Sequence, residues 1–131
     1  MKKRIVVVVA LAVLLAASAY AKTTDFFAIV KTGTPQDVQA AISQGADVNA
    51  RQVEGGMTPL IAAATFNPNL EVIAILLKAG ADVNARDMKA GATALMYAAA
   101  SNPISGVVTT LLEAGADIAA RDSVHDATAL M

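Results

Sequence analysis

Three aspartates, Asp47, Asp82 and Asp117, recur at intervals of 35 residues, and carboxylates at a fixed spacing suggest a calcium site. Calcium holds its oxygen ligands at about 2.4 Å. If each aspartate sits in its own stacked unit, however, neighbours lie about 10 Å apart, which is too far for one ion. We therefore predict that these aspartates form turns by accepting hydrogen bonds from nearby backbone amides, and that Asn49 and Asn84 do the same.

The chain offers few residues for catalysis or for transition-metal binding. It has no cysteine and a single histidine, His125. A histidine that acts as a base needs a nucleophile and an orienting partner, and a typical zinc site needs several Cys or His ligands. We therefore predict that the protein is not an enzyme and has no metal site and no cofactor, and we interpret His125 as an exposed turn residue.

A row of arginines, Arg51, Arg86 and Arg121, repeats with the same interval as the aspartates. Such a row either captures an acidic partner or is solvated and balanced by the repeated aspartates. We favour the solvated row, because exposed ion pairs contribute little to stability in either case.

These residues belong to a nine-residue segment that occurs three times with small changes, at 44–52, 79–87 and 114–122. Aligning residues 46–80 with 81–115 gives 18 identities in 35 positions without a gap. An internal repeat of about this length predicts a solenoid of stacked helical units.

The first unit carries clear helix signals. Residues 26–32 are predicted to form one helix, and a second is predicted to begin after Thr34. Thr34 can cap the free amides, Pro35 suits the first helical position, and Asp37 favours the positive end of the helix. Gly45 is predicted to end this helix in a left-handed conformation.

The next two units repeat that plan. Thr58 and Thr93 are predicted to open the first helix of each unit. The sequence Asn-Pro then interrupts both units, and Asn69 is predicted to cap the second helix of the first of them. Gly80 and Gly115 are predicted to end the second helices.

The sequence Thr-Pro-Leu-Ile-Ala-Ala-Ala at 58–64, with the helix and turn at 70–87, resembles the ankyrin repeat, and the resemblance covers essentially residues 25–131. It implies an all-α solenoid of stacked helix-turn-helix units with short β-hairpin or turn connections. It also implies protein binding by hairpin tips and a concave face of inner helices. Ile61 and Met96 stand where the family usually has a histidine, so the hydrogen bonds of that histidine must be absent or replaced.

We divide the chain into a leader at 1–21 and an ankyrin-repeat domain at 22–131. The domain comprises an N-terminal capping unit, two repeats and an incomplete repeat, at 22–45, 46–80, 81–115 and 116–131. The incomplete last unit leaves a second hypothesis open. The chain is then a fragment of a longer array, or a structural protein that self-associates through its uncapped C-terminal end.

The N-terminus has the pattern of a cleavable signal peptide. A basic segment at 2–4 precedes an unbroken apolar run of 13 residues at 5–17, and the small residues of 19–21 favour cleavage after Ala21. The run is short for a membrane core of about 30 Å. We therefore expect an exported, periplasmic or secreted protein, in keeping with a bacterial origin. The alternative is a chain tethered to the membrane by an uncleaved signal anchor.

Charge and composition exclude some partners. Cleavage would remove three of the ten basic residues and no acidic one, so seven basic residues would remain against eleven acidic ones. A mildly acidic chain without a basic block is not expected to bind nucleic acid. It is also not expected to bind a membrane once the leader is removed. Without cysteine there are no disulfides, so packing alone must stabilise the fold.

Positions that vary between units while their surroundings stay constant are the predicted partner-binding residues. In the hairpins these positions are Val53, Glu54, Met57, Met88, Lys89, Ala92, Val124 and His125. At the ends of the first helices they are Thr65, Phe66, Ala100 and Ser101. Phe66, Met57 and Met88 are predicted apolar anchors, since Met adapts to irregular surfaces. Phe66 packing into its own array remains an alternative, and Tyr97 either fills space between units or faces the groove.

Overall fold

The computed structural model describes residues 26–101, 105–124 and 128–129, and these form helices joined by turns and loops, with no β-strand among them. The predicted leader and His125 lie outside the described residues. A helical segment at 26–32 is followed by five helices. These are α2 (Pro35–Ser43), α3 (Pro59–Phe66), α4 (Leu70–Lys78), α5 (Ala94–Ser101) and α6 (Ser105–Glu113). The predicted all-α repeat fold is confirmed.

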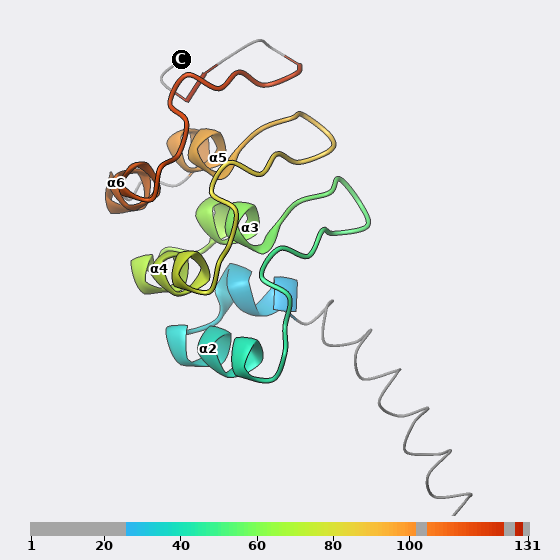
Figure 1. The fold of residues 1–131 in the computed structure, drawn as a ribbon, viewed down its shortest axis with the longest axis vertical. Helices are drawn as coiled ribbons and strands as arrows, with labels where there is room; N and C mark the ends of the chain where they lie inside the picture. The colour runs from blue at the N-terminus through green and yellow to red at the C-terminus, as the bar shows by residue number, and fades with distance from the viewer. Residues whose placement is uncertain (1–25, 102–104, 125–127, 130–131) are drawn as a thin grey trace, which may run out of the picture.

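The units stack along one axis, and their long loops project to the same side (Figure 1). α3 packs against α4 within its unit and against α5 of the next, while α4 packs against α2 and α6. We call the segment 26–32, α3 and α5 the inner helices, because they lie next to the long loops, and α2, α4 and α6 the outer helices. The linking turns that follow the outer helices are residues 44–50, 79–85 and 114–120. The hairpin loops that come next are residues 51–57, 86–92 and 121–124.

The start of α2 follows the predicted capping pattern. The hydroxyl of Thr34 accepts a hydrogen bond from the amide of Asp37 at 3.2 Å, and the carboxylate of Asp37 accepts from the amide of Thr34 at 3.1 Å. The bond from the Thr34 amide, followed by one that the Thr34 hydroxyl donates to the same carboxylate at 2.8 Å, holds the pKa of Asp37 below its usual value. Pro35 occupies the first turn, where its missing amide hydrogen is not needed.

The outer helices end as the glycine pattern predicts. Gly45, Gly80 and Gly115 have φ angles of 97°, 98° and 93°, which lie in the left-handed region. At the first of them, the amide of Gly45 donates to Ile42 at 3.0 Å and the amide of Ala46 donates to Ala41 at 3.0 Å. This pair of bonds satisfies carbonyls that the helix end leaves free, and it reverses the chain into the linking turn.

The hydrophobic core runs through the stack without interruption. α3 is buried on nearly all sides, because the alanines at 62–64 allow its neighbours to approach closely. Ile61, which replaces the usual histidine, is also buried. Burial of each large aliphatic side chain stabilises the fold by about 1.5–3 kcal/mol. In the part of the chain that is described, no helix has the length and apolar character needed to cross a bilayer.

Candidate interaction surface

The repeated aspartates form turns, as predicted. In each linking turn a carboxylate oxygen accepts from the backbone amide two residues further on. The distances are 2.9 Å from Asn49 to Asp47, 3.0 Å from Asn84 to Asp82, and 2.9 Å from Ala119 to Asp117. No group of three or more metal-ligating side chains occurs among the described residues.

Asn49 and Asn84 do not share that local role, so this part of the prediction is wrong. The side chain of Asn49 donates to the carbonyl of Gly80 at 3.0 Å and accepts from the amide of Asp82 at 2.8 Å. Both partners belong to the following linking turn, residues 79–85. Asn84 makes the same two bonds to the linking turn after it, residues 114–120, at 3.2 and 2.8 Å. Each asparagine therefore clamps its linking turn to the following one.

The arginine row has a role that neither of our interpretations included. Arg51 donates from Nη1 to the carbonyl of Gly56 at 3.1 Å and to the carbonyl of Arg86 at 2.7 Å. The first bond closes its own hairpin loop, and the second reaches the loop of the next unit. Arg86 repeats both bonds one unit later, at 3.1 and 2.6 Å. The guanidinium groups thus bind backbone carbonyls in place of the balancing aspartates that we expected.

Asn67 forms a third link between units, which sequence reasoning missed. Its side chain is 2% exposed, and it donates to the carbonyls of Val30 at 2.9 Å and Gly33 at 3.2 Å. Its side-chain oxygen accepts from the amide of Asn69 at 2.9 Å. As predicted, Asn69 caps α4, through a bond from the Glu71 amide at 2.9 Å. Asn67 therefore joins the capping unit to the first full repeat.

The tips of the hairpin loops are also joined by backbone bonds. The amide of Met88 donates to Gly55 at 2.8 Å, and one unit later the amide of Ser123 donates to Ala90 at 2.7 Å. The loops approach so closely that a Cβ on Gly56 would lie 2.3 Å from Cγ of Met88. The hairpin loops are thus fixed relative to one another before any partner binds.

Several predicted binding residues stand on this frame with exposed side chains. Val53 is 94% exposed, Met88 77% and Phe66 55%, and Val124 is exposed as well. Glu54, Lys89, Ala100 and Ser101 are also exposed. Lys31 of the preceding unit lies over the ring of Phe66, with Nζ 5.3 Å from the ring centroid. Phe66 is therefore not packed away inside its own array.

Three other predicted positions are less available. Ala92 is only 7% exposed, so its prediction as a contact residue is wrong: it lies at the base of its hairpin loop. Met57 is half-buried and packs against the core, so it is not the exposed anchor that we expected. Thr65 is half-buried, and its hydroxyl donates to the carbonyl of Ile61 at 2.7 Å.

A family model described as ankyrin repeats (3 copies) matches residues 26–122. The chain belongs to the ankyrin-repeat family. A comparison with curated proteins found no match. Ankyrin repeats generally mediate protein–protein interactions and are typically non-catalytic, so membership of the family supports binding to a protein partner.

Within this ankyrin fold, Tyr97 holds a hairpin loop to an inner helix. Its hydroxyl donates to Oδ2 of Asp87 at 2.8 Å, while Oδ1 of the same carboxylate accepts from the amide of Ala92 at 2.8 Å. Burial, followed by the hydrogen bond and the charge of Asp87, raises the pKa of Tyr97 to about 12. Tyr97 thus links the hairpin loop and the inner helix of its own unit, a role that neither of our two expectations described.

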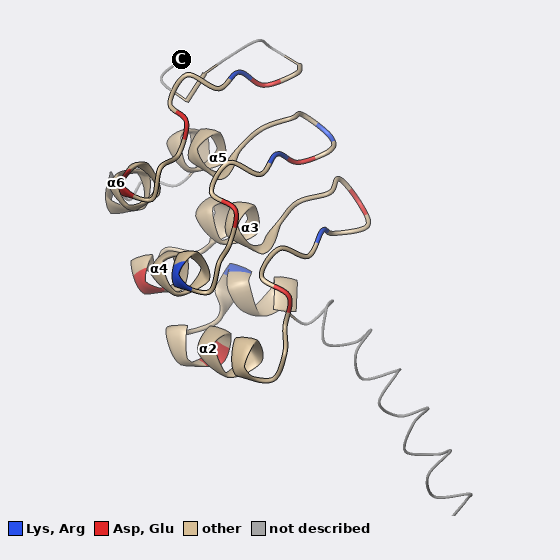
Figure 2. Ribbon diagram, in the orientation of Figure 1, with Lys and Arg blue, Asp and Glu red and all other residues tan. Residues whose placement is uncertain are grey.

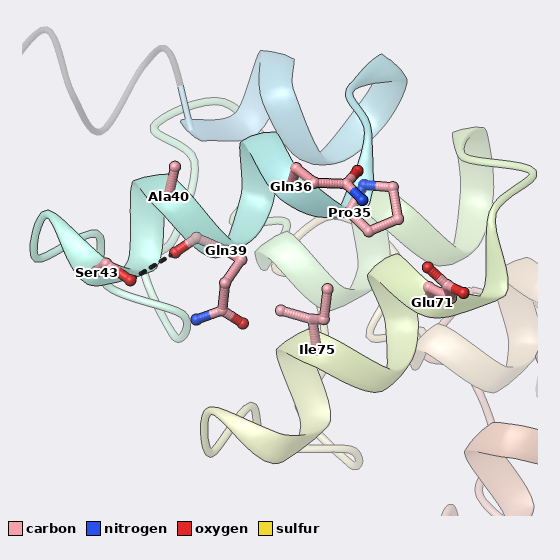
Figure 3. A pocket seen from close by; sticks show the side chains of 7 residues that line it. All are labelled: Pro35, Gln36, Gln39, Ala40, Ser43, Glu71 and Ile75. Atoms are coloured by element: carbon pink, nitrogen blue, oxygen red, sulfur yellow. Dashed lines mark hydrogen bonds between the residues drawn. The ribbon is translucent and has the colours of Figure 1, made fainter.

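A shallow depression of about 500 Å³ lies between α2 and α4, on the side of the outer helices (Figure 3). It is lined by Pro35, Gln36, Gln39, Ala40, Ser43, Glu71 and Ile75. Glu71 is the only titratable residue in this lining, so the depression lacks the acid–base pair that catalysis would need. It is also separate from the predicted contact surface on the hairpin loops and inner helices.

Proposed function

We propose that this protein is an exported, non-catalytic ankyrin scaffold that binds a protein partner through its hairpin tips and the concave face of its inner helices. The observation that carries the proposal is the exposure of Val53 and Met88, 94% and 77%, at equivalent positions of neighbouring hairpin loops. Large apolar side chains in contact with water are favourable anchors for a partner, because their burial releases that water.

The fixed frame under these side chains supports the same proposal. Association loses free energy whenever mobile loops must be ordered, so a surface that is ordered in advance binds more tightly. Arg51 and the backbone bond between Met88 and Gly55 already hold neighbouring loops together. Phe66 adds an exposed aromatic ring at the end of α3.

Crosslinking tests the proposed surface directly. A photoreactive amino acid is placed at Val53 or at Met88 in producing cells, and at exposed Gln39 on α2 as the matched control. We expect discrete protein adducts from the two loop positions and none from the control. Equal adducts from all three positions, or none from either loop, would rule out the hairpin loops as the contact surface.

Export rests on the sequence pattern of the leader, and it has its own test. N-terminal sequencing of the protein recovered from an exported fraction should begin at Lys22. An intact N-terminus in the membrane fraction would favour the uncleaved signal anchor instead. A protein in the cytoplasm with its leader intact would contradict export in either form.

Self-association through the C-terminal end is the second candidate function. Leu112 at the end of α6 and Ile118 in the linking turn after it are exposed, whereas Leu77 and Val83, which lie 35 residues earlier, are half-buried. Light scattering across a concentration series distinguishes the two functions. A size that increases with concentration, and that falls on substitution of Leu112 and Ile118 by Asp, favours self-association. A monomer at all concentrations favours the binding scaffold alone.

A further inference from the structure

The charges of the described residues are divided unequally between two groups of elements: the inner helices with the hairpin loops, which we call the loop side, and the outer helices with the linking turns. Basic residues dominate the inner helices and hairpin loops: Lys31, Arg51, Arg86, Lys89 and Arg121. The acidic residues on that side are Glu54, Asp87 and Asp122. Five basic against three acidic residues give a formal charge of +2. Asp87 is buried and bonded to Tyr97, so the exposed charge on this side is more positive still.

The outer helices and the linking turns carry the opposite charge. Lys78 is their one basic residue among those described. Their acidic residues are Asp37, Asp47, Glu71, Asp82, Glu113 and Asp117. One basic against six acidic residues give −5. Figure 2 shows the basic positions of the hairpin loops and the acidic positions of the linking turns. A net-negative protein thus presents a positive side.

On the positive side, cationic and apolar groups stand close together. The ammonium group of Lys31 lies over Phe66, and exposed Met88 is followed directly by exposed Lys89. Arg51 and Arg86 are exposed as well, and their Nη1 atoms bind backbone carbonyls. A guanidinium has five N–H donors, so the Nε–Nη2 edge remains for a carboxylate.

We infer that the partner segment bound by this surface is acidic and carries apolar side chains. This inference rests on the proposed function, because it names the chemistry that fits the same hairpin loops and inner helices. Carboxylates of the partner would meet Lys89, Arg51 and Arg86, and its apolar side chains would cover Val53, Met88 and Phe66. The −5 charge of the outer helices and linking turns repels the same segment, so electrostatics favours binding to the loop side.

Selection from a random peptide library displayed on phage, against the purified full chain, identifies the chemistry without knowledge of the natural partner. We expect the enriched peptides to combine Asp or Glu with large apolar residues. Their affinity should fall as the salt concentration rises from about 0.15 M to about 1 M, because salt screens exposed charges. An unrelated DNA duplex should not displace them; displacement would point to a general anion site and contradict the inference.

Four charge-reversal variants, two of them matched controls, then test where the enriched peptides bind. Lys89→Glu on a hairpin loop should weaken the enriched peptides by roughly three- to tenfold, and Glu54→Lys should strengthen them by a similar factor. The controls are Lys78→Glu and Glu71→Lys on the outer helix α4, which should change affinity by less than about twofold because they lie on the other side. Opposite signs from the two loop variants cannot arise from loss of folding.

The outcomes separate this inference from the proposed function. If the enriched peptides depend on Val53 and Met88 but are neutral or basic, the binding surface stands and the acidic partner is wrong. If they are acidic but respond equally to the loop variants and the controls, the location is wrong. If no peptide depends on Val53 or Met88, or none is enriched, both the inference and the proposed surface fail.

Discussion

Replacement of Asn67 by Ala tests how much the links between units contribute to stability. The substitution removes two donated hydrogen bonds, to Val30 and Gly33, and one accepted from Asn69. A typical hydrogen bond contributes about 0.5–1.5 kcal/mol, and a buried polar group left without its partner costs about 1–3 kcal/mol. We therefore expect the free energy of unfolding to fall by about 2–4 kcal/mol, a large fraction of the roughly 5–15 kcal/mol of a typical domain.

Urea unfolding followed by circular dichroism measures this loss, and Asn69→Ala is the matched control. Asn69 is two residues away, is exposed, and caps α4 by a single side-chain bond to Glu71. Removal of a cap of this kind typically costs about 1 kcal/mol. If Asn67→Ala costs no more than the control, the buried amide does not hold the capping unit in place, and our reasoning about it is wrong.

Asn67→Asp makes the test more specific, because it keeps the size of the side chain and replaces its NH2 donor with a carboxylate oxygen. One carboxylate oxygen would then face the carbonyls of Val30 and Gly33, so the pKa of the new carboxyl must be raised in the folded state. Stability relative to the wild type would be highest below the unfolded pKa of about 3.9 and would be lost as the pH rises through the folded value. A pH-independent difference from the wild type would contradict this geometry.

Three further predictions concern other links. Burial and Asp87 raise the pKa of Tyr97 to about 12, so the wild type should lose stability as the pH rises from about 10 toward 12. Tyr97→Phe should abolish this loss, and thermal melts in alkaline buffers measure the difference. Gly80→Ala should cost about 1–2 kcal/mol in urea unfolding through its φ of 98° alone, because an added Cβ meets no atom within 4 Å, and Gly80→Asn should cost less. Asn84→Ala should cost about 1–2 kcal/mol, and hydrogen exchange of the Asp117 amide should become faster. The first prediction is wrong if Tyr97→Phe and the wild type lose the same stability in alkaline melts. The second is wrong if Gly80→Ala and Gly80→Asn cost the same free energy of unfolding. The third is wrong if the Asp117 amide exchanges at the wild-type rate in Asn84→Ala.

The features that were predicted correctly from the sequence are those determined by residues within a few positions of one another. The cap that Thr34 places on the amide of Asp37 joins residues three apart, and the left-handed Gly45 depends on its own backbone. The turn bonds of the aspartates span two residues. In such cases residue type nearly determines the partner, because few other groups lie within reach.

The links between units could not be assigned in the same way. The bonds of Asn49 to the next linking turn and of Arg51 to the next hairpin loop span 31 to 35 residues, and those of Asn67 to the capping unit span 34 and 37. Their partners are backbone groups, which leave no mark in the sequence. The one available signal was recurrence: Asn49 and Asn67 recur 35 residues later and Arg51 recurs twice, which indicates a role that one unit alone does not explain.

Variation between units was an incomplete guide to the contact surface for a related reason. Met57 and Ala92 are equivalent positions that differ in type, yet both lie at the base of a hairpin loop. The amide of Ala92 donates to buried Asp87, which the earlier unit replaces with Gln52. Two buried positions can change together where one packs on the other, so variation alone does not establish exposure.

Within each hairpin loop, the bonds that link neighbouring units and the exposed side chains involve different groups. Arg51 donates to the carbonyl of Arg86, and the amide of Met88 donates to the carbonyl of Gly55. These acceptors belong to the backbone, so they persist whatever side chain stands beside them. Val53 and Met88 project from the same loops with most of their surface in water. Their chemistry can therefore be changed at little cost to the stack, which is the property that a scaffold needs if each loop is to be fitted to a partner.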